Sequence, residues 1–137
     1  MAIALGEDFR LMVEIAGTPT LVGGIDTFDD SSEANVTTYN YFGAGTPLGV
    51  PDPRALTITA SGALDPADAG QNALRTHRTD RTVATIHVLH DGTNGYELDV
   101  LVTGGGRGAS AAGGPQTTTW AFAAQGDPVI VGTGPLP

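Results

Sequence analysis

Polar and apolar residues alternate along much of the chain, and such a period of two predicts half-buried β-strands. Turn-forming residues separate the alternating stretches. In chain order these predicted strands are 9–16, 20–25, 34–41, 54–62, 82–90, 96–103 and 116–124. Between the second and third strands, residues 26–33 form an acidic piece with no clear period, which we expect to be irregular. The pattern therefore predicts about seven strands.

The alternation also assigns residues to the two faces of each strand. The following side chains should point inward: Phe9, Leu11, Val13, Ile15, Leu56, Ile58, Ala60, Tyr96, Leu98, Val100, Val102, Trp120 and Phe122. Glu14 lies on the polar face of the first strand, and Glu97 and Asp99 on that of the sixth. The fifth and sixth strands flank the turn 91–95 and should form a hairpin. The turn Gly17-Thr-Pro19 should likewise join the first two strands in antiparallel order.

One segment has helical rather than strand spacing. Asp65 and Pro66 suit a helix start, because an aspartate caps free N–H groups and a proline in the first turn loses no hydrogen bond. Downstream, small or apolar residues recur at helical spacing and should pack on the sheet. This narrow face comprises Ala67, Gly70, Leu74 and His77.

These elements predict a single domain over residues 1–137. Its fold class is mainly β, an antiparallel β-sandwich or partly open barrel with one short flanking α-helix. Residues 42–53 hold three glycines, three prolines and several apolar side chains, so we expect an extended loop there. Residues 104–114 should form a flexible glycine-rich loop, and residues 126–137 a C-terminal arm.

Charge and composition exclude several classes of protein. All six basic residues are arginine, and 15 acids leave a formal charge of −9. Gripping nucleic acid needs clustered cations, which this chain lacks. There is no cysteine, so neither a disulfide scaffold nor a thiolate metal site is available. We expect no membrane span and no export signal, because no long apolar run and no basic N-terminal segment is present.

Candidate chemistry is sparse. Acids at positions 26, 29, 30 and 33 do not have the spacing of a calcium-binding loop. His87 and His90 lie three apart on a predicted strand, so they should point to opposite faces and not share a metal. No nucleophile elbow and no phosphate loop is complete. We therefore expect neither a catalytic site nor a cofactor.

Taken together, several short stretches resemble the tail tube proteins, or major tail proteins, of long-tailed bacteriophages. They are the early strand pair, the extended loop at 42–53, the run Ala55–Gly62 leading into Leu64–Leu74, the hairpin around Asp91-Gly92, and the closing Thr119–Gly126. The resemblance covers nearly the whole chain as a pattern of elements.

The resemblance implies a structural subunit that builds rings of six, stacked into a hollow tube for DNA delivery into the host. It implies no enzymatic activity. The implied partners are further copies of the chain, a tape measure protein and the viral genome in the lumen, and tail terminator and tail tip proteins. The implied location is the virion tail, after synthesis in the cytoplasm of the host bacterium.

Physical arguments suggest which residues would serve such a role. Apolar segments without a periodic place in the fold are candidates for contacts between subunits. These are Phe42, Pro47, Leu48, Val50, Val129, Ile130 and Val131. Acids on polar strand faces are candidates for lining a lumen, namely Glu14, Glu97 and Asp99.

A second class remains open, a non-catalytic β-sandwich module for binding or for decorating a virion. Such a module would present an aromatic platform to its ligand. The only tryptophan, Trp120, has the pattern of a core residue, which favours the tube subunit.

Overall fold

A computed structural model describes residues 6–33, 36–39, 45, 48–51 and 55–137. They form a short 3-10 helix at Gly6–Asp8, one α-helix and ten strands. The strands before the helix are β1 (Arg10–Ile15), β2 (Thr18–Leu21), β3 (Ile25–Glu33), β4 (Val36–Tyr39), β5 (Leu48–Pro51) and β6 (Ala55–Ala63). Helix α1 (Ala69–Asp80) precedes β7 (Val83–Leu89), β8 (Gly95–Gly108), β9 (Thr117–Ala124) and β10 (Val129–Val131).

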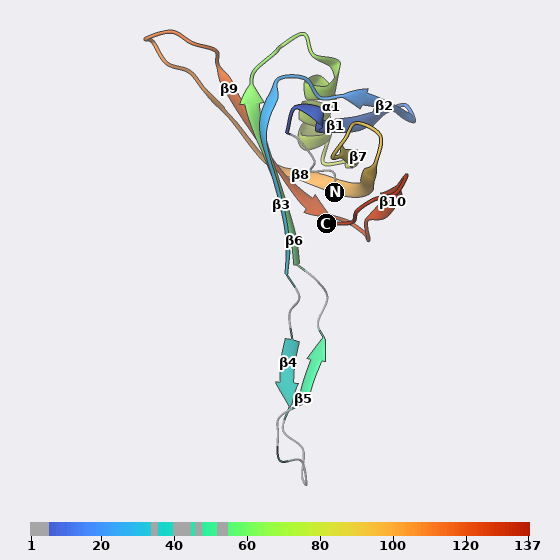
Figure 1. Ribbon diagram of the computed structural model, residues 1–137. Coiled ribbons are helices and arrows are strands. Elements are labelled where there is room, and N and C mark those ends of the chain that lie inside the picture. The colour runs from blue at the N-terminus through green and yellow to red at the C-terminus, as the bar shows by residue number, and fades with distance from the viewer. Residues whose placement is uncertain (1–5, 34–35, 40–44, 46–47, 52–54) are drawn as a thin grey trace.

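Eight of these strands form one antiparallel sheet. Its order is β2-β1-β7-β8-β9-β6-β3, and β10 pairs with β8. The sheet does not close, because β2 and β3 end it on opposite sides. Helix α1 contacts β1, β2, β7 and β8, and Figure 1 shows it flanking the curved sheet. The predicted class, mainly antiparallel β with one flanking helix, is confirmed, although the strands are more numerous than predicted.

The first hairpin is tighter than the sequence indicated. Ile15 pairs with Thr18, so only Ala16 and Gly17 form the turn. Both have positive φ, as a two-residue turn matched to the sheet twist requires. Pro19 therefore lies inside β2, which an edge strand tolerates because the missing N–H faces away from the ladder. Ile15, predicted inward, is 37% exposed at the strand end.

The acidic piece 26–33 was predicted to be irregular, and this was wrong. It belongs to β3, which pairs with β6 from Ile25 to Glu33 with one register shift after Ile25. An edge strand keeps a solvated side, so aspartates and serines there obscure the alternation. Phe28 is the apolar anchor of β3, since its ring lies 4.7 Å from the ring of Phe9.

The predicted extended loop at 42–53 is also partly regular. Leu48–Pro51 is strand β5, which pairs antiparallel with β4. Figure 1 shows this small two-stranded sheet beyond the ends of β3 and β6, away from the rest of the domain. The described strands of this region thus follow one long hairpin, β3 and β4 outward, β5 and β6 back. Phe42 and Pro47 lie outside the described residues.

Helix α1 begins later than predicted. Asp65 instead accepts a hydrogen bond from the Ala67 backbone N–H, which makes a turn before the helix. Asp68 is the N-cap, and its carboxylate accepts from the backbone N–H of Gln71 at 2.9 Å. Ala67 therefore lies before the helix. Gly70 and Leu74 are buried as predicted, but the sequence pattern missed Gln71, whose side chain is fully buried.

Gln71 joins the helix to two strand ends. Its side-chain N–H groups donate to the carbonyls of Gly23, at 2.7 Å, and Ala63, at 2.9 Å. Its carbonyl oxygen accepts from the Asp65 backbone and from Arg75. Every polar group of the amide is thus satisfied, as burial requires.

The glycine-rich segment predicted as a loop begins as strand. β8 continues to Gly108 and pairs with β9, with a register shift between Val102 and Gly104. At Gly105 the Arg78 guanidinium occupies the space that a Cβ would fill, so a larger residue there would have to displace this arginine side chain. The C-terminal arm is likewise partly regular, since β10 pairs with the start of β8.

The core lies between α1 and the inner face of the sheet. Trp120, Phe122, Leu98, Val100, Ile58 and Leu74 belong to one buried cluster, as the alternation predicted. Trp120 is 2% exposed, and Arg75 and Arg78 lie over its ring at 5.9 and 5.4 Å.

Substituting Gln71 by Met should lower the free energy of unfolding by about 2–4 kcal/mol, because two carbonyls and an N–H lose partners in a buried place. Urea denaturation measures the loss. Thr79→Ala, at an exposed position of the same helix, is the matched control and should change stability by less than about 0.5 kcal/mol. Equal stability of both variants would contradict the role given to Gln71.

Candidate functional site

The predicted acidic residues lie on one outer sheet face made by β1, β7 and β8. On this face the side chains form two rows that run across the strands, one at Thr85 and Asp99 and the next at His87 and Glu97. In one row, Thr85 pairs with Asp99, and the Thr85 hydroxyl donates to the Asp99 carboxylate at 2.6 Å; Glu14 follows Val13, which pairs with Ile86 next to Thr85. In the neighbouring row, His87 pairs directly with Glu97. The sequence placed Glu14, Glu97 and Asp99 on polar faces, and the strand order brings those faces together.

His87 connects the two rows. Its Nε2 lies 2.9 Å from a Glu14 carboxylate oxygen and 3.6 Å from one of Glu97. The local sequence pattern missed this group, because its members come from three strands that are adjacent only in the folded sheet. His90, by contrast, lies in the following turn with its Nε2 3.7 Å from Asp91.

A depression of about 260 Å³ adjoins these rows. Its acidic lining consists of Glu14, Glu97, Asp99 and Asp127, and Val129 of β10 also lines it. Among the described residues, the ion pairs of this face involve only His87 and no arginine. The face therefore carries uncompensated negative charge, which repels polyanions and attracts cations.

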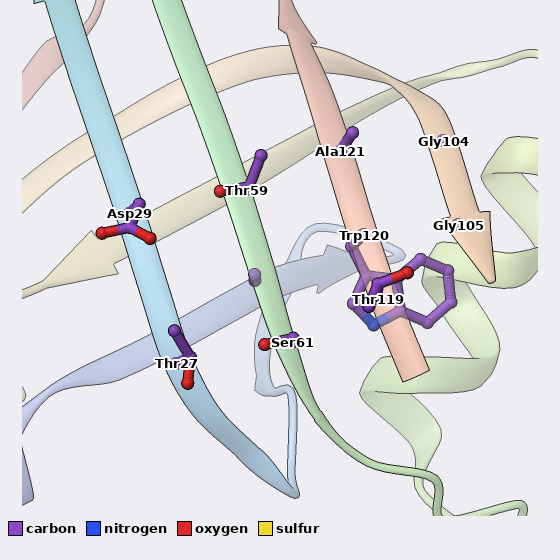
Figure 2. Close-up of a pocket in the computed structure, with 10 residues that line it drawn as sticks. Thr27, Asp29, Thr59, Ser61, Gly104, Gly105, Thr119, Trp120 and Ala121 are labelled. Atoms are coloured by element: carbon purple, nitrogen blue, oxygen red, sulfur yellow. The ribbon is translucent and has the colours of Figure 1, made fainter. Parts of the chain in front are cut away.

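A second outer face has a different character. A groove of about 360 Å³ runs over β3, β6 and β9. Figure 2 shows its hydroxyl-bearing lining, with Thr27 from β3, Thr59 and Ser61 from β6, and Thr119 from β9. Asp29 is the acidic residue of this groove. The groove offers neutral hydrogen-bonding groups in place of concentrated charge.

Trp120 of β9 borders this groove, but its side chain is almost completely buried. Its ring extends beside β9 toward the helix in Figure 2, and the residue is 2% exposed. A ligand platform needs an open aromatic face, which a buried ring does not offer. This burial counts against the binding-module class.

The candidate contact residues of the C-terminal arm stand on the surface. In β10, Val129 and Ile130 are 55% and 53% exposed, and Val131 is half-buried. Leu136 is a further exposed apolar residue of the arm. Leu48 and Val50 belong to β5, outside the core sheet.

A polar network fixes the arm to the turn between β7 and β8. The Asp91 carboxylate accepts hydrogen bonds from the Asn94 side chain, at 2.9 Å, and from the backbone of Thr93 and Asn94. These bonds, that of the Asn94 side chain foremost, lower the pKa of Asp91 below its ordinary value. The side-chain carbonyl oxygen of Asn94 in turn accepts a hydrogen bond from the Thr133 backbone N–H at 3.0 Å.

Comparison with known proteins gives matches at the level of structure. No family model and no curated protein matches the sequence. The chain superposes on a chain from the tail of an empty gene transfer agent particle, solved with C6 symmetry, with a TM-score of 0.78 at 16% identity. The match covers 93% of this chain and 98% of that chain. The chain has the tail tube fold.

Two further structures extend the comparison. The SPP1 tail tube matches the chain with a TM-score of 0.79 at 12% identity, over 97% of this chain and 81% of that chain. A chain of the anti-feeding prophage baseplate matches with a TM-score of 0.67 at 15% identity, over 96% and 97%. The resemblance inferred from the sequence is therefore confirmed for the fold. Among the described residues, no helix has the length and apolar character to cross a membrane.

In this tail tube fold, Asn94→Ala should loosen the C-terminal arm, because Thr133 loses its acceptor and Asp91 a donor. Amide hydrogen exchange should then speed up at Thr133 and in β10, while β7 and β9 keep their protection. Thr93→Ala is the matched control, since it leaves the contact between Asn94 and Thr133 in place. Unchanged exchange in β10 would mean that strand pairing alone holds the arm.

Proposed function

We propose that this protein is the structural subunit of a phage-type tail tube. Copies of the chain assemble into stacked hexameric rings, and the resulting channel delivers DNA into the host. The observation that carries the proposal is the match of fold along almost the entire chain to tail and tail tube structures. The role that we propose is structural and non-catalytic.

The geometry supports self-association. The sheet is open at β2 and β3, and open strand edges pair readily with other chains. A head-to-tail contact between identical subunits closes into a ring when its rotation permits, and rings with exposed apolar ends stack. The C6 symmetry of the gene transfer agent tail and the six-fold symmetry of the baseplate support a ring of six.

The same proposal assigns contacts and partners. The distal hairpin with Leu48 and Val50, together with Phe42 and Pro47, would reach a neighbouring subunit or ring. Val129, Ile130 and Val131 would form a second contact. The tape measure protein and later the genome occupy the lumen, and terminator and tip proteins bind the two tube ends. The site of action is the virion tail, after synthesis in the host cytoplasm.

Glu14, Glu97 and Asp99 would line the bore. Six copies carry a formal charge of six times −9, or −54. A positive wall would hold DNA through many phosphate contacts that must break as the genome moves. A negative wall repels the duplex from all sides, although salt limits the effect to about 8–10 Å from the wall.

Replacing residues 36–51 by a two-residue turn should give a folded monomer that does not build tubes. The β4–β5 sheet pairs only within itself among the described residues, so its removal spares the core. Circular dichroism checks folding, and negative-stain electron microscopy checks assembly. Deletion of the exposed turn 110–113, which holds no large apolar side chain, is the matched comparison and should permit tubes. Normal tubes after loss of residues 36–51 would refute the assembly role of the hairpin.

The double variant Glu97→Lys and Asp99→Lys should permit tubes but slow genome release, more at low salt than at high salt. Release from assembled particles is followed by the fluorescence of a DNA-binding dye. Asp26→Lys with Asp29→Lys changes the charge equally on β3 and is the matched control. Slow release only in the β3 variant would refute the lining role of Glu97 and Asp99.

A further inference from the structure

We infer that Glu14, His87 and Glu97 form a binding site for a divalent transition metal such as Zn²⁺. The inference rests on the side chains of one subunit and does not depend on the proposed function. One candidate ligand atom from each residue lies within 4.8 Å of the other two. Each residue comes from a different strand, and these strands, β1, β7 and β8, are neighbours in the sheet.

Two of the three ligand separations are close to those in the coordination sphere of zinc, and the third is within 4.8 Å. Zn²⁺ binds imidazole nitrogen and carboxylate oxygen at about 2.0–2.2 Å, so neighbouring tetrahedral ligands lie about 3.3 Å apart. The His87 Nε2 is 2.9 Å from the Glu14 oxygen and 3.6 Å from the Glu97 oxygen. These two separations bracket the required value. Glutamate side chains are flexible, so metal binding would require them to adjust until all three atoms coordinate the ion.

The electrostatics also favour a cation. Two carboxylates face one imidazole, and no arginine of the described residues forms an ion pair with either carboxylate. Asp99 and Asp127 line the adjoining depression and add negative charge nearby. A divalent cation would neutralise both glutamates and leave a coordination position open toward this depression.

The sheet holds the central ligand in place. The His87 side chain is only 12% exposed, and its strand pairs on both sides, with β1 through Met12 and with β8 through Glu97. A nitrogen ligand with two carboxylate oxygens suits Zn²⁺ and similar transition metals better than Ca²⁺ or Mg²⁺, which prefer oxygen alone.

Isothermal titration of ZnCl₂ into the full chain tests the site. The wild type should bind one Zn²⁺ per chain, and His87→Gln and Glu97→Gln should each weaken binding by about tenfold or more. His90→Gln is the matched control, because it removes a histidine that faces a single carboxylate, and it should bind like the wild type. Absence of saturable binding up to about 1 mM Zn²⁺, or equal affinity of His87→Gln and the wild type, would overturn the inference.

The site can also be located in the wild type alone, so that the test does not require the substituted proteins to fold. Titration with Co²⁺ should broaden the backbone amide signals of Glu14, His87 and Glu97 first in a two-dimensional NMR spectrum. Broadening centred instead on His90 and Asp91 would place the bound metal elsewhere and overturn the assignment.

Discussion

The seating of α1 on the sheet is the constraint on which the rest of this structure depends. Gln71 hydrogen-bonds the carbonyls of Gly23 and Ala63, and Asp68 binds the Gly23 N–H while capping the helix. Gly70 permits the close approach, since a Cβ would lie 2.5 Å from the Leu21 carbonyl oxygen. With the helix held there, Leu74 is fully buried in the core cluster. Buried polar groups that are fully paired favour one arrangement over its alternatives.

The alternation of polar and apolar residues predicted those strands that have one buried and one exposed face. The alternation from Tyr96 to Val102 identified a buried face because packing against α1 excludes polar groups there. It failed for β3, where an edge strand places aspartates and serines in solvent, and for β10, which is too short to show a period. The glycines at Gly104–Gly108 led to the wrong prediction of a loop. They belong to strand β8, where they accommodate a register shift and the Arg78 side chain.

The candidate site was only partly accessible to sequence reasoning for a related reason. Each acid was assigned to an outer face from its own strand, which requires only the period of two. Glu14, His87 and Glu97 come together only because β7 lies between β1 and β8 in the sheet. The strand register must also align Glu14 with His87, which is 73 positions later in the chain. Strand order is a property of the whole chain, so a histidine motif within one strand could not reveal it.

The long hairpin that runs through β3 and β4 and returns through β5 and β6 also determines how the protein carries mechanical tension. Hydrogen bonds between antiparallel strands stand perpendicular to the strands. A pull on the distal end along the hairpin therefore acts as a shear force on the hydrogen bonds between β6 and β9. These bonds share the force, so many of them must break at the same time. A sideways pull would open the β4–β5 ladder one pair at a time. The pairing of β6 with β9 therefore resists a pull along the strands better than a pull across them.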